Sequence, residues 1–333
     1  MKIFFLENSE IEYDSNDRYE NKIRGGESVL INLSEKMSSL GHEIHVFNKS
    51  KHNRKKINGV FWSNIDFLKN NSIKISCDVA IAQADANIFG LVKSKKNFLL
   101  SHSVQKFEKF FRKNQAFPFI KYRPKVIVAS NYHYKTRSFL TSFYGKIKLF
   151  WSIDEIFSNC QLDNSLVEKK AIFTTRPDRN LDLLLEIWNK KIFPFSKESY
   201  LFINPPYTIK STDKNVKLRT LGSQHNLLKD LKSSRVMLVP GHKGEIYCLA
   251  AREAAEMCIP IVTFGIGALS ERVEHNKTGF IAKNTNEFAN YALMLLNEEK
   301  IWFEFRNNLF KKRNKISWMD AAKTLNNYLV NDK

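Results

Sequence analysis

Short, almost wholly apolar runs alternate with amphipathic stretches along this chain, and that alternation is the strongest constraint on its fold. Residues 78–82 and 125–130 carry few polar side chains, as expected for strands buried on both faces of a parallel sheet. Residues 26–40 place apolar side chains on one helical side, and Gly41 follows as a residue that ends helices. A series of this kind predicts a doubly wound α/β domain.

The series stops once and then restarts. Residues 152–169 are polar and have the composition of a linker. The chain of 333 residues also exceeds the ~250–300 residues at which a single core usually stops growing. We therefore predict two Rossmann-like domains, residues 1–155 and 165–315, that face a central cleft, and a closing C-terminal helix, residues 316–333. Ligands of such sheets bind at the carboxyl ends of the strands.

The individual predictions follow from the same patterns. The predicted strands are residues 2–6, 43–47, 59–62, 78–82, 97–101, 125–130, 147–150, 171–174, 200–204, 217–221, 235–240 and 260–264. The predicted helices are residues 26–40, 181–188, 249–257, 285–296, 300–311 and 317–330.

Composition excludes several classes of protein. No apolar run reaches the ~18–20 residues that span a bilayer, and the apolar start MKIFFL is too short for a secretory signal and reads as a buried strand. The four cysteines lie far apart, without a CxxC pair, which predicts reduced thiols in a cytoplasmic enzyme rather than disulfides or zinc. The net charge of +19 fits nucleic acid, an anionic membrane, a phosphorylated substrate, or simply a lysine-rich surface.

The most specific motif spans residues 245–253. Glu245 is expected in the loop after a strand, and Glu253 near the start of the next helix. Backbone N–H groups of Tyr247, Cys248 and Leu249 lie where that helix begins, and a helix start attracts anions such as a diphosphate. Carboxylates accept hydrogen bonds from sugar hydroxyls. Alternatively, both glutamates are ordinary solvated charges.

The stretch 240–262 resembles the retaining glycosyltransferases of the GT-B fold, family 4 (glycosyl transferases group 1), whose signature is two glutamates separated by seven residues. Four further segments resemble that family, in the same order: residues 24–46, 175–179, 265–280 and 317–318. The chain departs from the family where Ile246, Tyr247 and Cys248 replace a Gly-Phe-Gly triplet, and where two basic residues are three rather than about five positions apart.

The resemblance implies roles for individual residues. Glu245, His102, Arg176 and Arg179 are the candidate catalytic residues. Gly25, Gly26, Arg176, Arg179, Glu245, Tyr247, Cys248, Leu249 and Glu253 are the candidate donor-binding residues. The implied reaction moves a sugar from a nucleotide-diphosphate donor, bound by the second domain, to a glycan or lipid-linked acceptor, bound by the first. His102 ends a predicted strand, where a structural role is an equal alternative.

Cofactor motifs are missing from the sequence. It contains no Asp-x-Asp motif and no metal-ligand spacing, so we expect no metal cofactor. No GxGxxG follows the first strand, which argues against a dinucleotide oxidoreductase.

Basic and aromatic residues interleave over Lys106–Arg123. This pattern fits contact with an anionic membrane surface, from the cytoplasmic side, because cations and aromatic rings both favour the headgroup region. It also fits base stacking in nucleic acid, or an aromatic face buried beneath basic side chains. A basic nucleic-acid-binding α/β protein is thus one rival function, although Glu245 and Glu253 would repel phosphates, so we expect no nucleic-acid partner. A nucleotide-sugar epimerase of the same fold is another rival.

Overall fold

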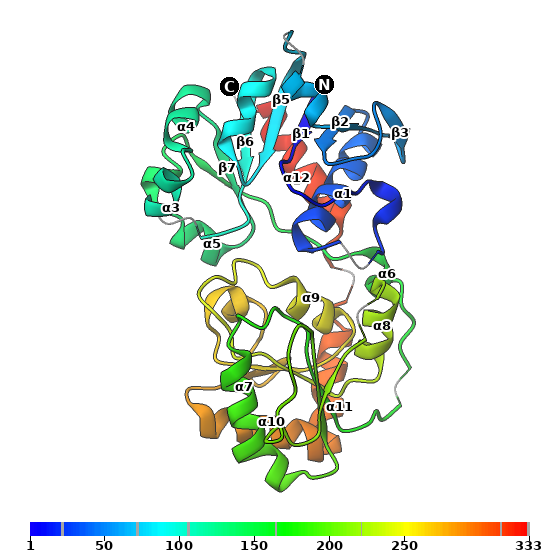
Figure 1. Ribbon diagram of the computed structural model, residues 1–333. Helices are drawn as coiled ribbons and strands as arrows, with labels where there is room; N and C mark the ends of the chain where they lie inside the picture. The colour runs from blue at the N-terminus through cyan, green and yellow to red at the C-terminus, as the bar shows by residue number, and fades with distance from the viewer. Residues whose placement is uncertain are drawn as a thin grey trace. The chain divides into compact units, whose positions relative to one another are not determined.

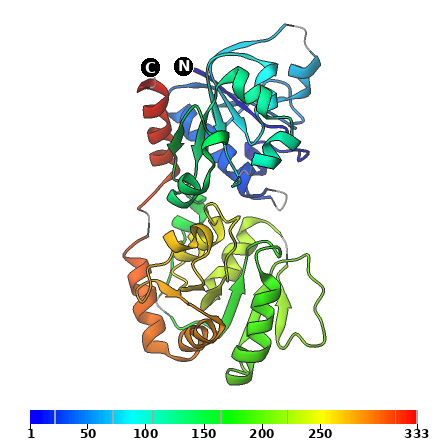
Figure 2. The ribbon, with the colours of Figure 1, turned by 90° about the vertical axis from the view of Figure 1, so that its left-hand side faces the viewer.

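The protein forms two compact units in a computed structural model (Figures 1 and 2), which describes residues 1–20, 23–70, 73–104, 107–163, 165–220, 222–313 and 315–331. Unit 1 comprises Met1–Ser152 and Ile316–Lys333, and unit 2 comprises Ile153–Lys315. The division falls at the very start of the predicted linker 152–169. Helix α6 (Glu155–Ser158), inside that segment, already buries Phe157 in the core of unit 2, and Asn164 lies outside the described residues.

Unit 1 is built on an eight-stranded sheet in the order β3-β4-β2-β1-β5-β6-β7-β8. Neighbouring strands are parallel except β3 and β4. The strands are β1 Lys2–Leu6, β2 Glu43–Asn48, β3 Lys55–Ile57, β4 Val60–Asn64, β5 Ser76–Gln83, β6 Lys93–Leu100, β7 Lys125–Val128 and β8 Lys146–Lys148. The predicted strands of this half are confirmed. The prediction missed β3, because a three-residue strand with one apolar side chain shows no periodicity; Asn58 and Gly59, both at positive φ, turn it back along β4.

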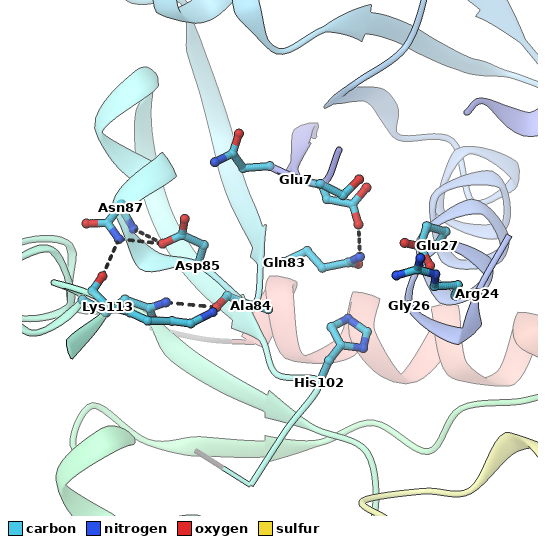
Figure 3. Close-up of a pocket in the computed structure, with 13 residues that line it drawn as sticks. Glu7, Arg24, Gly26, Glu27, Gln83, Ala84, Asp85, Asn87, His102 and Lys113 are labelled. Atoms are coloured by element: carbon cyan, nitrogen blue, oxygen red, sulfur yellow. Dashed lines mark hydrogen bonds between the residues drawn. The ribbon is translucent and has the colours of Figure 1, made fainter. Parts of the chain in front are cut away.

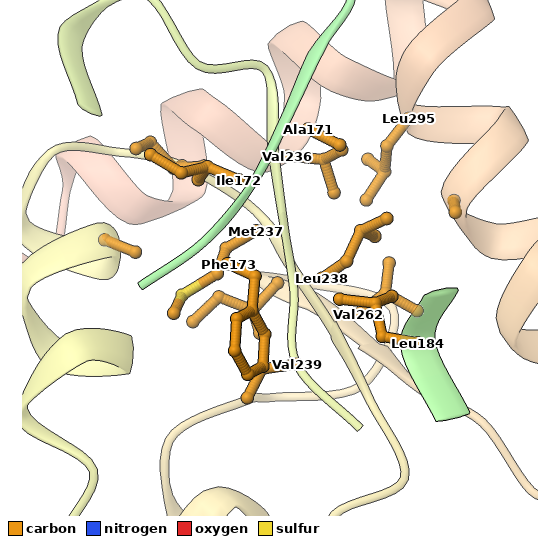
Figure 4. Close-up of a cluster of buried hydrophobic side chains, with 14 of the residues drawn as sticks. Ala171, Ile172, Phe173, Leu184, Val236, Met237, Leu238, Val239, Val262 and Leu295 are labelled. Carbon is orange, nitrogen blue, oxygen red and sulfur yellow. The ribbon is translucent and has the colours of Figure 1, made fainter. Parts of the chain in front are cut away.

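Unit 2 is built on a six-stranded, wholly parallel sheet in the order β11-β10-β9-β12-β13-β14. The strands are β9 Lys170–Phe173, β10 Tyr200–Ile203, β11 Val216–Leu218, β12 Val236–Leu238, β13 Ile261–Thr263 and β14 Gly279–Ile281. Renumbered within the unit, this order is 3-2-1-4-5-6, the order of dinucleotide-binding sheets. Short apolar strands such as β9 and β12 bury both faces, and their side chains fill the core in Figure 4. The predicted strand 217–221 ends at Leu218, and Leu221 lies outside the described residues.

Helices cover both sheets. Those of unit 1 include α1 Gly25–Ser39, α2 Asp66–Asn70, α3 Phe107–Arg112, α4 Ala116–Tyr122, α5 Asn131–Thr136 and α12 Trp318–Asn331. Those of unit 2 include α7 Leu181–Ile187, α8 Gln224–Lys232, α9 Leu249–Glu256, α10 Thr285–Asn297 and α11 Glu299–Phe310. None of the helices in these described stretches combines the length and apolarity that a bilayer-spanning helix needs.

The C-terminal helix α12 belongs to unit 1 rather than standing apart as a separate closing element. It lies beside α1 (Figure 1) and buries Trp318 and Leu325. Asn326 Oδ1 lies 2.9 Å from His42 Nε2, and the Leu329 carbonyl accepts a hydrogen bond of 3.0 Å from Lys96. Apolar burial and these polar contacts therefore hold the chain's last helix to the first half of its sequence.

Each sheet reverses its strand order once. In unit 1 the reversal lies between β1 and β5, and in unit 2 between β9 and β12. The loops that leave the carboxyl ends of two such strands diverge to opposite faces of the sheet, which opens a crevice there. The candidate functional residues lie in these two places.

Candidate functional site

The loop after β12 holds Glu245 against Arg179. Glu245 Oε1 lies 3.1 Å from Arg179 Nε, and Arg179 Nη1 lies 2.6 Å from His242 Nδ1. The Gly244 N–H also donates to His242 Nδ1, over 2.9 Å. Nδ1 therefore acts as an acceptor, and the proton of the neutral ring is on Nε2. Three side chains of two loops, one after β9 and one after β12, thus form a connected polar group.

Two opposing effects act on the pKa of Glu245. Burial raises the pKa of this carboxyl group, and the neighbouring Arg179 guanidinium opposes that shift. Asn180, which adopts a left-handed conformation with φ 66°, donates to the Gly241 carbonyl and ties the turn that carries Arg179 to the loop of Glu245. These contacts fix the Arg179 guanidinium at the carboxyl end of the sheet.

Gly267 lets a second loop close onto the loop of Glu245. Its φ is 76°, and a Cβ atom there would lie 2.6 Å from the His242 carbonyl oxygen and 2.8 Å from that of Glu245. No side chain fits that space, so this position requires glycine. The Ala268 N–H then donates to the Glu245 carbonyl, over 2.8 Å.

Helix α9 begins without a capping side chain. Cys248, at its N-cap, has φ 59° and ψ 76°, a left-handed conformation that glycine favours. The backbone thus takes a glycine-like path although the family's glycine is absent. Burial raises the pKa of the Cys248 thiol well above its ordinary value, so this group stays protonated and is no nucleophile. Leu249 is the first helical residue, where the positive end of the helix dipole favours an anion.

Tyr247 is a packing residue. Its side chain is buried, and the Arg272 guanidinium lies 4.1 Å from the centre of its ring. Arg272 Nε also donates to the Tyr247 carbonyl, over 3.0 Å. The contribution of Tyr247 to the site is therefore to hold the loop before α9, rather than to offer its ring to a ligand.

The carboxylate of Glu253 has no partner among the described residues. It is half-buried in α9, and neither a hydrogen bond nor an ion pair joins its carboxylate to another described residue. Burial raises its pKa to about 7; Arg219 opposes this shift, and Asp154 adds to it. A buried, unused acceptor of this kind is stabilised by a ligand that donates hydrogen bonds.

The two arginines of the predicted basic pair lie apart. The Arg179 side chain is 17% exposed and contacts Glu245, whereas Arg176 is 74% exposed and pairs with Asp178 at 2.6 Å. Sequence reasoning missed His242 and two threonines that follow β9. The hydroxyl groups of Thr174 and Thr175 are buried without a partner. Their position directly after the central strand is the signal that could have found them.

Unit 1 has a pocket of about 600 Å³ at the carboxyl ends of β1, β5 and β6 (Figure 3). Six of its lining residues are Glu7, Arg24, Gly26, Glu27, Gln83 and His102. Three of these come from the turn and first residues of α1, which has no capping side chain. The backbone N–H groups of Gly25 and Gly26 therefore lie at an open helix start.

His102 is a neutral residue of this pocket. Burial lowers its pKa to about 4, and its Nε2 atom is buried without a hydrogen-bond partner. Its ring centre lies 5.1 Å from that of Trp151. Sequence reasoning found His102, Gly25 and Gly26 but missed Glu7, Glu27 and Gln83. Glu7 directly follows β1 and Gln83 ends β5, so adjacency of strand ends could have revealed this pair.

Metal-ligating side chains do not gather anywhere in the described part of the chain. It contains no group of three His, Cys, Asp or Glu side chains that could hold an ion, and its four cysteines are free. The candidate residues therefore offer two kinds of chemistry: carboxylates for hydroxyl donors, and a cation with open helix starts for anions.

Comparisons with known proteins identify the fold. The family described as "Glycosyl transferases group 1" matches residues 207–315, which include both glutamates of the motif. No curated protein sequence matches the chain.

Solved structures match over three quarters of the chain or more. WaaG, a glycosyltransferase involved in lipopolysaccharide biosynthesis, is 10% identical with a TM-score of 0.71, over 99% of this chain and 100% of its own. HepE of Anabaena, solved with UDP and glucose, is 13% identical with a TM-score of 0.68, over 99% and 100%. TarM of S. aureus, solved with UDP and α-GlcNAc-glycerol, is 19% identical with a TM-score of 0.58; the match covers 75% of this chain but 55% of TarM. These matches confirm the predicted GT-B fold.

Proposed function

We propose that this chain, a GT-B glycosyltransferase whose residues 207–315 match the glycosyl transferases group 1 family, moves a sugar from a nucleotide-diphosphate donor to a glycan or lipid-linked acceptor with retention of configuration. The observation that carries the proposal is the arrangement in unit 2, where Arg179 and the start of α9 accompany two carboxylates, Glu245 and Glu253. The acceptor would bind in unit 1.

The relatives support the donor and acceptor classes. HepE and TarM were both solved with UDP, so a uridine nucleotide is our first choice of donor. WaaG acts in lipopolysaccharide biosynthesis and TarM was solved with a sugar-glycerol compound. We therefore propose a role in polysaccharide biosynthesis at the cytoplasmic face of a membrane.

The chemistry needs a stabilised leaving group. As the glycosidic bond breaks, negative charge grows on the departing diphosphate, and fixed cations and N–H groups stabilise such charge best where water is excluded. Arg179 and the start of α9 fill this role without a metal in our proposal. The acceptor hydroxyl would attack from the face that the diphosphate leaves, and its proton would pass to a phosphate oxygen. The Cys248 thiol is not activated as a nucleophile, since burial raises its pKa.

Glu253 gives the most direct test of nucleotide binding. If its carboxylate accepts hydrogen bonds from the ribose, Glu253→Ala should weaken binding of UDP by roughly 1.5–3 kcal/mol, about 10- to 150-fold in Kd. Titration calorimetry measures this change. Glu186→Ala is the matched control, because Glu186 is an exposed residue of α7 that pairs with the exposed Lys190. Equal UDP affinity of Glu253→Ala and the wild type would remove Glu253 from the site.

An aromatic–basic surface on unit 1 supports the membrane part of the proposal. We define it as the exposed side chains of α3, α4, one residue between them and segment 139–143, together with the half-buried Lys109: Phe107, Lys109, Phe111, Arg112, Lys113, Phe117, Ile120, Lys121, Phe139, Leu140 and Phe143. Phe117 is 72% and Phe139 66% exposed. Phe110 and Phe119 are buried beneath them, and Tyr122 is partly buried against the same core, so the alternative of a packed aromatic face holds for these rings. Lys106 lies outside the described residues.

Ring contacts make this surface continuous. Phe139 lies 5.3 Å from Phe143, which contacts Tyr144 at 5.4 Å, and Tyr144 contacts Phe119 of α4 at 5.5 Å. Segment 139–143, beyond the predicted range, thus joins the surface in space. Exposed apolar patches of this kind mark interaction sites, and cations among aromatic rings favour anionic lipid headgroups.

Vesicle binding tests the surface. The protein should cosediment with anionic vesicles more than with neutral ones, and salt should weaken binding because charges are screened within ~10 Å at 0.1 M. Changing Lys109, Arg112 and Lys113 to Ser should reduce binding by about 1 kcal/mol per charge, and Phe139→Ser with Phe143→Ser should reduce it further. Phe195→Ser, an equally exposed ring on unit 2, is the control. Equal, negligible binding to both vesicles would contradict the membrane role.

A further inference from the structure

The pocket of unit 1 contains two buried carboxylates that no cation balances. Glu7 is 4% and Glu27 7% exposed, and both line the pocket (Figure 3). Neither forms an ion pair with a described residue, although Arg24 and Lys113 line the same pocket. Burying a carboxylate is costly unless a charge or hydrogen bonds compensate it. Hydrogen bonds compensate Glu7, whereas Glu27 has no partner among the described residues.

The polar atoms of this pocket that lack a hydrogen-bond partner are acceptors. Glu7 already accepts from the Tyr13 hydroxyl and from Gln83 Nε2. This leaves Gln83 Oε1 buried without a partner, on a side chain that is itself almost wholly buried. Glu27 has no partner of either kind within the described chain. A ligand that fits here must donate hydrogen bonds to Gln83 and Glu27.

The charge of the pocket favours one kind of hydrogen-bond donor over others. Burial raises the pKa of Glu7 to about 7; its hydrogen bond from Tyr13 opposes this shift, and the charge of Glu27 adds to it. The charge of Glu27 therefore acts on Glu7, and a neutral hydroxyl donor would leave that buried charge of Glu27 without an opposite charge. A metal ion would need at least three ligating side chains close together. Asp85 and His102 also line this pocket, but no three His, Cys, Asp or Glu side chains of the described residues are grouped so that they could hold an ion. An ammonium group supplies both the positive charge and up to three donors.

We propose that this pocket binds the ammonium group of an amino sugar in the acceptor, with Glu27 as its negatively charged partner and Gln83 Oε1 as a second hydrogen-bond acceptor. This inference rests on the proposed function, which assigns the acceptor to unit 1. The volume of about 600 Å³ lies within the 300–1,000 Å³ range of small-molecule sites. Glu27 and Gln83 are then specificity-determining residues, and an acceptor that bears a hydroxyl or an acetylated amine at that position binds more weakly.

Two sugars that differ in one group test the proposal. Binding of glucosamine and of glucose to the full chain is measured by calorimetry at pH 6.5, where the amine is protonated. We expect glucosamine to bind at least about tenfold more tightly, the gain typical of one charged hydrogen bond. Glu27→Gln should abolish the preference, because it weakens binding of glucosamine much more than binding of glucose. Glu43→Gln, an exposed glutamate of β2, should keep it.

Three results would contradict binding of an ammonium group. Equal affinity for the two sugars, a preference that survives in Glu27→Gln, or displacement of glucosamine by Mg²⁺ would overturn the inference. Thermal melting shows whether Glu27→Gln is folded, and Glu27→Asp, which keeps the charge, should retain the preference in part. A chain that binds UDP but does not prefer glucosamine refutes this inference alone, whereas a chain that binds no UDP refutes the proposed function.

Discussion

Replacing Arg179 with methionine is expected to lower kcat/KM for sugar transfer by about 10²- to 10³-fold, the loss found when one preorganised charge-stabilising group is removed. Arg179 is the half-buried cation of the unit 2 site, fixed by Glu245 and His242. Methionine keeps much of its length but removes the positive charge. The measurement is the initial rate of nucleotide release from the donor with EDTA present, since our proposal places no metal at the diphosphate.

Arg176→Met is the matched control. Arg176 lies three residues earlier but is largely exposed and pairs with Asp178. Exposed ion pairs contribute about 0–1 kcal/mol, so we expect its rate to stay within about threefold of the wild type. Two results would contradict the assignment: a full rate in Arg179→Met, or a larger loss in Arg176→Met. Loss of all activity in EDTA, restored by Mg²⁺ or Mn²⁺, would instead contradict the metal-free mechanism.

Replacing Glu7 with glutamine is expected to stabilise the protein increasingly as the pH rises. The folded-state pKa of Glu7 is about 7, against an ordinary value of 4.5. Between these values the unfolded chain has lost a proton that the folded chain keeps, so the free energy of unfolding falls as pH rises. A shift of this size corresponds to about 3 kcal/mol. Glutamine cannot ionise and keeps polar atoms toward Tyr13 and Gln83.

The comparison is made by denaturant unfolding at pH 4.5 and pH 8. The advantage of Glu7→Gln over the wild type should be small at pH 4.5 and about 3 kcal/mol larger at pH 8. Glu43→Gln serves as the control, because a hydrogen bond from His45 lowers the pKa of that exposed carboxyl group, so its substitution should give no gain at high pH. An advantage of Glu7→Gln that does not change with pH would show that Glu7 ionises normally in the folded chain.

Much of the fold could be predicted because parallel strands are locally recognisable. Strands such as β1 and β5 are buried on both faces, so each appears in the sequence as an uninterrupted apolar run, and the amphipathic runs between them predict the crossover helices. The strand β3 could not be found in this way, since its residues Lys55 and Lys56 are exposed. Its pairing depends on the turn at Asn58 and Gly59, not on apolar periodicity.

The candidate site was predictable only in part. The spacing of Glu245 and Glu253 is a local property of one loop and helix, and the sequence displays it directly. The choice between Arg176 and Arg179 is not local, because it depends on which side chain the turn at Asn180 directs toward the loop after β12. The continuation of the aromatic–basic surface onto Phe139 and Phe143 likewise depends on how distant segments pack.

Local patterns along the chain are enough to predict two α/β units, the glutamate pair beside a helix start, and the candidate donor loop at Gly25 and Gly26. The electrostatics of the site depend instead on how the chain folds. Glu7 and Gln83 are 76 positions apart, yet the adjacency of β1 and β5 brings them together beside Glu27 and removes them from water. Burial and pairing of these side chains depend on contacts between segments that are distant in the sequence. No local pattern therefore reveals that these carboxylates share one pocket or that the pKa of Glu7 is raised.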